Sequence, residues 1–267
     1  MKLAPVNLTP VKLFSKTTLL LCTFVVLTTL IITAPATLLS GWATQASQGR
    51  LLLTNVSGTL WQGSATPVLL QKNNALLPLQ KMHWSIHPWS LFTGKLSLSL
   101  WRDDLPQTSA MRAVLSPSQL ELHDLNLTMP AAVLGEISPM LRPAQLQGKI
   151  QLTSKHLQLT PQNIIGTAQA DWFDAGAALS PVNPLGFYNV TLNGAPDNGT
   201  AERLNITLAT TSGALILNGQ GSWSHAKGLQ FRGTAQAAEQ HRAMLAGLLG
   251  HLGPQESPGV YTLVLSQ

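Results

Sequence analysis

The chain has 267 residues, of which only 10% are charged, and its formal net charge is +5. Ordinary soluble domains are about 25% charged, and here serine, threonine, asparagine and glutamine fill the polar positions, which is typical of sheet-rich rather than helical proteins. The basic residues are scattered singly, which argues against a nucleic-acid-binding protein, and the single cysteine excludes a disulfide framework.

The first element is an uncharged, apolar run at residues 17–39, which predicts a membrane-spanning helix. Aliphatic residues dominate the run, and threonines and Cys22 are its main interruptions up to Ile32. Threonine is compatible with lipid because a helical hydroxyl can bond the carbonyl three or four residues earlier. We therefore interpret residues 17–39 as a transmembrane anchor.

The flanks of the anchor predict its orientation. Three lysines precede it without any acid, and they are Lys2, Lys12 and Lys16. Because the next charge is Arg50, the positive-inside rule predicts a cytoplasmic tail at residues 1–16 and a domain outside the membrane at residues 40–267. The alternative is a cleaved signal peptide, for which Ala-Pro-Ala at residues 34–36 offers a poor cleavage site.

Beyond the anchor, the sequence predicts short strands joined by turns. Residues 50–70 contain two runs rich in leucine, valine and threonine, broken at glycines, which favours a hairpin. At residues 96–101 leucine alternates strictly with polar or aromatic residues, the clearest strand period in the chain. Similar runs continue to residue 237, and Asn198-Gly199 suits a hairpin turn.

One strand pattern contains an irregularity. Leu120 and Leu122 alternate with polar residues, and the pattern resumes at Leu125 and Leu127, one residue out of phase. A slip of one residue inside a strand is what a β-bulge produces. We therefore expect a bend, or a break between two strands, at His123-Asp124.

Two segments predict helices within this β-rich domain. Residues 130–143 suit a short helix, and residues 237–250 suit a longer one with leucines on one face. Residues 259–267 read as a last strand, apolar on both faces and therefore expected to be buried. The predicted fold class is mainly β: an elongated, curved antiparallel sheet with one or two short helices, behind an N-terminal transmembrane helix.

Residues with catalytic or metal-binding potential are sparse. The chain has no nucleophile elbow, no H-E-x-x-H and no phosphate loop. His83 and His87 share a strand face, but on a flat strand they would lie about 13 Å apart, too far for one ion. We therefore predict from the sequence that the protein is not an enzyme and that it has no catalytic residue, no cofactor and no metal site.

The seven tryptophans divide into two groups. Trp42 follows the apolar run and suits a membrane interface. The others lie in or beside strands, where core packing is expected: Trp61, Trp84, Trp89, Trp101, Trp172 and Trp223. The alternative for these is an aromatic-lined groove that faces lipid or a partner.

Two ordered motifs follow the predicted anchor. The first is Gly-Thr-Leu-Trp-Gln-Gly-Ser-Ala, in which Gly58, Thr59, Trp61 and Gly63 are the motif residues. The second is Trp-Ser-Ile-His-Pro-Trp-Ser-Leu and the glycine that follows it, with motif residues Trp84, Pro88, Leu91 and Gly94. Together with the anchor, these motifs resemble those of the type II secretion system protein N family of Gram-negative bacteria, and the likeness covers almost the whole chain.

The resemblance implies an accessory subunit of the inner membrane, single-pass, with a cytoplasmic N-terminus and a periplasmic β-rich domain. Such a subunit contributes structurally to the platform that exports folded proteins across the outer membrane. Its implied partners are other inner-membrane subunits of that platform, with lipid as a further partner and no nucleic acid. The motif residues are expected to be structural. AsmA-like membrane proteins share this style of β-rich sequence, so a lipid-binding or lipid-transfer envelope protein is the alternative function.

Overall fold

A computed structural model describes residues 16–70, 75–104, 106–107, 110–161, 163–194, 204–224 and 226–266. The tail predicted at residues 1–16 lies, except for Lys16, outside the described residues, as does the turn predicted at Asn198-Gly199. The helical elements are α1 (Lys16–Ile32), α2 (Thr37–Ala46), η1 (Pro88–Thr93), α3 (Val133–Ile137), η3 (Pro139–Ala144), η4 (Glu239–His241) and α4 (Arg242–Leu252). The strands are β1 (Leu51–Gly58), β2 (Gln62–Leu70), β3 (Leu76–Pro78), β4 (Met82–His87), β5 (Leu96–Arg102), β6 (Met111–Leu115), β7 (Leu120–Pro130), β8 (Leu146–Leu159), β9 (Ile164–Ala177), β10 (Gly186–Gly194), β11 (Leu204–Gly213), β12 (Leu215–Ser224), β13 (Gly228–Ala237), β14 (Gln255–Ser257) and β15 (Val260–Ser266).

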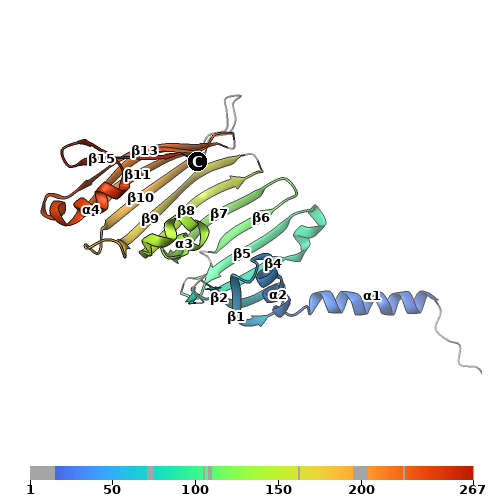
Figure 1. Ribbon diagram of the computed structural model, residues 1–267. Helices are drawn as coiled ribbons and strands as arrows, with labels where there is room; N and C mark the ends of the chain where they lie inside the picture. The colour runs from blue at the N-terminus through green and yellow to red at the C-terminus, as the bar shows by residue number, and fades with distance from the viewer. Residues whose placement is uncertain are drawn as a thin grey trace, which may run out of the picture.

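These strands form one antiparallel sheet of 15 strands, in the order β1-β2-β4-β5-β6-β7-β8-β9-β10-β11-β12-β13-β15-β14, with β3 paired to β2. Nearly every strand pairs with its neighbour in sequence, so the sheet is a long meander built from local hairpins. Figure 1 shows the strands side by side along an extended, twisted sheet, with α1 projecting away from its first strands. The prediction of a mainly β, antiparallel sheet with few short helices is confirmed.

In the middle of the sheet, one face is apolar and the other is polar. Cross-strand partners share a face. Strands β7 and β8 pair Leu127 with Leu152 on one face and Thr128 with Gln151 on the other. The polar row continues to Asp171 on β9. The low charge of the chain thus reflects a sheet whose polar face is built largely from uncharged side chains.

Two apolar clusters lie at opposite ends of the sheet. At the C-terminal end α4 contacts β13 and β15, and its Leu245 and Leu249 are fully buried. The other buried members of that cluster are Ala177, Leu185, Ala214, Leu215, Ala235 and Ala237. At the N-terminal end α2 packs on β1, and the buried cluster there is Ala36, Ala65 and Trp84.

The apolar run at residues 17–39 is not one continuous helix as predicted. Helix α1 ends at Ile32 and α2 begins at Thr37. Between them lies Pro35, which has no N–H group for a helical hydrogen bond and instead forms an isolated β-bridge with Thr59. In the part of the chain that the structure describes, no helix is both long enough and apolar enough to cross a membrane.

The predicted irregularity in β7 is located at Asp124. This residue has a φ of 53°, in the left-handed region, while β7 runs unbroken on both sides of it. On β8, the register against β9 shifts at the same level, between Thr153 and Leu157. The sheet therefore bends within β7 and β8 rather than breaking into separate strands.

The predicted helices are present with different bounds, because β7 extends to Pro130 and β13 extends to Ala237. The prediction that the last strand is buried on both faces is wrong for its outer half. Val264 and Leu265 are 59% and 47% exposed. The three-residue strand β14 pairs with β15 only at Val260 and Tyr261. The rest of β15 therefore lies at the edge of the described sheet.

Candidate functional site

The two motif segments meet at the N-terminal end of the sheet, beside the end of α1. Gly58 and Gly63 are cross-strand partners in the β1–β2 hairpin. Gly58 has a φ of 94°, and a Cβ there would overlap the carbonyl oxygen of Gln62. A Cβ on Gly63 would lie 2.5 Å from both the Ser57 carbonyl oxygen and a ring carbon of Trp84. Both positions therefore require glycine.

The turn between β1 and β2 is hydrogen-bonded to the chain segment that follows α1. Within the turn, the Thr59 amide donates to the Gln62 carbonyl at 2.8 Å, and the Gln62 amide donates to the Thr59 hydroxyl at 3.2 Å. Outside it, the Leu60 amide donates to the Ala34 carbonyl at 2.8 Å. The linker between α1 and α2 is thus attached to the first hairpin by backbone hydrogen bonds.

Two tryptophan side chains extend this attachment in opposite directions. The indole Nε1 of Trp61 donates to the Ile31 carbonyl at 2.9 Å. Carbonyls in the last turn of a helix have no partner within the helix. The Ile31 carbonyl accepts from the Ala34 amide at 3.4 Å and, at the shorter distance, from Trp61. The indole Nε1 of Trp84, a buried residue of β4, donates to the Leu60 carbonyl at 3.1 Å. The end of α1, the turn and β4 are therefore linked in series.

The second motif ends in the 3-10 helix η1, which begins at Pro88. Gly94 caps this helix with a φ of 71°. Its apolar side chains point outward: Leu91 is 48% exposed, Trp89 79% and Phe92 84%. The rings of Trp89 and Phe92 stack with centroids 5.9 Å apart. The expectation that Trp89 packs in the core is wrong, because its side chain is largely exposed on η1.

Among the cavities at this end of the sheet, two lie beside the helices. One, of about 500 Å³, lies between the end of α1, the hairpin turn and η1, and it is lined by Ile31, Ile32, Thr59, Trp61, Gln62, Ile86, Pro88, Leu91 and Phe92. The other, of about 240 Å³, lies between α2 and the first strands and is lined by apolar side chains, including Leu39, Trp42, Trp84 and Leu100. Residues of both motifs thus line one cavity with the end of α1.

His83 and His87, the two histidines of β4, have different surroundings. His83 Nε2 donates to Oδ1 of Asp103 at 2.6 Å, and its ring stacks on Trp101 with centroids 5.5 Å apart. This hydrogen bond, with the charge of Lys81 at 3.8 Å, lowers the pKa of Asp103. His87 is exposed at the end of β4. His83 therefore belongs to a small surface network.

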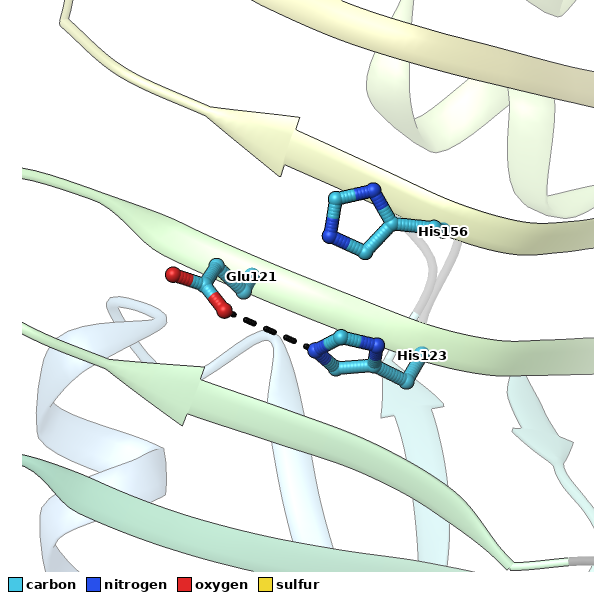
Figure 2. Close-up of side chains that lie close together, drawn as sticks. All are labelled: Glu121, His123 and His156. Carbon is cyan, nitrogen blue, oxygen red and sulfur yellow. Dashed lines mark ion pairs between the residues drawn. The ribbon is translucent and has the colours of Figure 1, made fainter.

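A second histidine group was not identified from the sequence. Glu121 and His123 on β7 and His156 on β8 have ligand atoms that all lie within 4.8 Å of one another. Figure 2 shows the three side chains together on one side of the two strands. The spacing of Glu121 and His123 is visible in the sequence. His156 lies 33 residues after His123, and the register between β7 and β8 brings the two histidines together.

The fold and the motif site together define a class: a protein with a single open antiparallel sheet, whose first hairpin is bonded to the end of an apolar N-terminal helix. The chain belongs to the type II secretion system protein N family. The family model, described as type II secretion system (T2SS), protein N, matches residues 49–264 and so contains both motifs. This membership supports involvement in type II secretion, a process of the cell envelope. Comparison with curated proteins gives no match, and comparison with solved structures gives none either.

Proposed function

We propose that this chain is an accessory, non-enzymatic subunit of the type II secretion system in the inner membrane, and that it contributes structurally to the platform that exports folded proteins from the periplasm. Family membership over residues 49–264 supports the general assignment. The observation that carries the structural role is the hydrogen bond from Trp61 to the end of α1, because it joins the helix to the sheet at a defined position. Its partners would be other inner-membrane subunits.

We further propose that the segment at residues 17–39 anchors the chain through α1, while Pro35 and Ala36 within it contact the first strands. Residues 1–16 would then lie in the cytoplasm and residues 40–267 in the periplasm. The apolar side chains of α1 are exposed, among them Leu20 at 70% and Phe24 at 68%. Thr23, Thr28, Thr29 and Thr33 each donate a hydroxyl hydrogen bond to the carbonyl four residues earlier, at 2.7–2.9 Å. Apolar side chains without protein cover and internally satisfied hydroxyls are what a lipid-embedded helix requires.

Exposed aromatic residues near the end of α1 support a membrane-proximal position for the first strands. Trp42 on α2 is 70% exposed, and Phe92 on η1 lines the same cavity as Ile31 and Ile32. Aromatic rings are enriched at the membrane–water interface, where an apolar ring meets a polar boundary. We assign Trp42, Trp89 and Phe92 to that boundary.

The motif residues have structural roles in this proposal. Gly58 and Gly63 permit close backbone contact, and Thr59 closes the hairpin turn. Pro88 and Gly94 begin and end η1, and Leu91 lines the cavity beside α1. The residues that link the anchor to the sheet are Trp61 and Trp84. The motifs therefore set the position of the periplasmic sheet relative to the membrane.

Gene deletion with complementation tests the proposal. We expect secreted enzymes to accumulate in the periplasm of the deletion strain while its outer-membrane barrier stays intact, and the full chain to restore secretion. Reporter fusions after residue 16 and at the C-terminus test the orientation. Normal secretion in the deletion strain, or a cytoplasmic C-terminus, would contradict the proposal.

Lipid binding is the second candidate function, and the cavity of about 240 Å³ with an apolar lining is the observation that favours it. In this case the sheet would hold acyl chains between membranes. Deletion would then give a detergent-sensitive envelope with normal secretion. Site-specific crosslinking from Trp89 and Trp101 separates the two functions, because lipid adducts and subunit adducts differ greatly in mass.

A further inference from the structure

The group formed by Glu121, His123 and His156 has the arrangement of a three-ligand metal site on a sheet. His123 and His156 are cross-strand partners, and Glu121 lies two residues from His123 on the same strand. Residues i and i+2 of one strand share a face with the cross-strand partner. Three donors therefore converge on one point above the polar face of β7 and β8.

The distances are close to those of a bound ion. Oε2 of Glu121 lies 3.5 Å from Nε2 of His123, and the ring centroids of the two histidines are 4.8 Å apart. In a tetrahedral zinc site with bonds of about 2.0–2.1 Å, neighbouring ligand atoms are about 3.3 Å apart. The ligand atoms all lie within 4.8 Å of one another, so an ion would draw the three side chains closer together.

The carboxylate of Glu121 is already oriented by its neighbours. Nε2 of Gln119 donates to its Oε1 at 2.6 Å, and Nε2 of Gln158 donates to Oε1 of Gln119 at 2.6 Å. Oε1 is thereby occupied, and Oε2 is directed toward His123. Such outer hydrogen bonds are what orients the ligands in metal sites.

The bend of the sheet lies at the same level. Asp124, with its φ of 53°, follows His123 directly, and the β8 register shift between Thr153 and Leu157 spans His156. Bulges re-aim the side chains beside them. An ion bound here would hold β7 and β8 together at the level where the register between β8 and β9 shifts.

We propose that Glu121, His123 and His156 bind one divalent transition-metal ion, with Zn²⁺ as the ion best suited to two imidazoles and one carboxylate. Water would complete the coordination, since the three side chains are partly exposed or exposed. Arg112 on β6 is the next cross-strand neighbour of His123, and its positive charge limits the affinity rather than supplying a ligand. The proposal is independent of the proposed secretion function.

Titration of the full chain in detergent with ZnCl₂, followed by calorimetry, tests the site. We expect one ion per chain, and a loss of affinity of more than about 100-fold in H123A and in H156A, because each removes a direct ligand. Gln119→Ala removes only the orienting hydrogen bond, and we expect a loss of about 10–100-fold. The matched control is His87→Gln, an exposed histidine of β4, which leaves the affinity unchanged.

Co²⁺ supplies a spectroscopic test of the same ligands. The intensity of the visible d–d bands of bound Co²⁺ reports the geometry of its ligand shell. We expect intense bands in the wild-type chain and in His87→Gln but not in H123A. Circular dichroism of each variant establishes that the sheet is intact, and Glu121→Gln provides a near-isosteric variant if H123A unfolds. Equal binding in Glu121→Gln and wild type, or loss of binding in His87→Gln, would overturn the proposal.

Discussion

The two ends of the sheet are stabilised in different ways. At the C-terminal end, α4 buries Leu245 and Leu249 against alanines of the sheet, so a helix is held by apolar contact along its length. At the N-terminal end, the buried cluster is small, and α1 is held at its last turn by hydrogen bonds from the first hairpin. The comparison shows how one meander can carry a packed helix at one end and a projecting helix at the other.

The largest expected effect concerns the C-terminal end. Leu249→Ala removes a side chain that is 1% exposed, and we expect it to lower the free energy of unfolding by about 2–5 kcal/mol, because it leaves a cavity under α4. Met244→Ala on the same helix is the control, since Met244 is 51% exposed and should change stability by about 0.5 kcal/mol or less. Denaturant titration measures both. Equal effects would mean that α4 is not held by burial.

At the N-terminal end, backbone proximity replaces side-chain burial. Gly63→Ala places a Cβ 2.5 Å from the Ser57 carbonyl and from the Trp84 ring, and we expect a loss of about 1–3 kcal/mol from overpacking. Gly41→Ala in α2 is the matched control, because no atom lies within 4 Å of its new Cβ. That control should raise stability by about 0.5–1 kcal/mol, since alanine favours the helix. Thermal unfolding of both variants distinguishes them by sign.

A smaller effect tests the link to α1 itself. Trp61→Phe keeps an aromatic ring but removes the donor to the Ile31 carbonyl, and we expect a loss of about 1 kcal/mol. Hydrogen exchange should also become faster in the linker at residues 33–36. The control is Trp89→Phe, because Trp89 is 79% exposed on η1. If the linker exchanges at the same rate in Trp61→Phe and in wild type, α1 is held by other contacts.

Local patterns were sufficient to predict much of this fold. The strict alternation at residues 96–101 correctly predicted β5, because the two-residue period of a strand can be recognised from neighbouring residues. The one-residue shift in the leucine alternation beside Asp124 likewise predicted the irregularity in β7. The threonine back-bonds in α1 also follow from helix geometry over four residues.

Features that depend on distant pairing were not predictable in this way. The bridge between Pro35 and Thr59 pairs distant residues and no local pattern reveals it, although Pro35 by itself is a local signal that a helix ends. His156 meets His123 only through the register of β7 and β8. The exposure of Trp89 depends on how η1 lies against the sheet, which the sequence of this short helix does not specify. The candidate metal site was missed for this reason, whereas the motif residues were found by resemblance.

The smallest expected effect is electrostatic and lies on the exposed side of the N-terminal end. The hydrogen bond from His83, and secondarily the charge of Lys81, hold the pKa of Asp103 below its ordinary value of 3.8. The unfolded chain therefore binds a proton at this carboxyl more readily than the folded chain does. The resulting stabilisation is present above about pH 4 and is lost as the pH falls through the lower, folded pKa. Asp103→Asn should flatten the acid dependence of the unfolding midpoint below about pH 4.

Asp124→Asn is the control for that measurement. Asn tolerates the left-handed backbone at this position, and Asp124 is not among the groups that shift the pKa of Asp103. A denaturant series from about pH 6 to about pH 2 compares both variants with wild type. If Asp103→Asn retains the wild-type acid dependence, the His83–Asp103 pair contributes nothing to folding. The N-terminal end would then rest on its small apolar cluster, its backbone contacts and its tryptophan hydrogen bonds, which would sharpen the contrast with the packed helix at the other end.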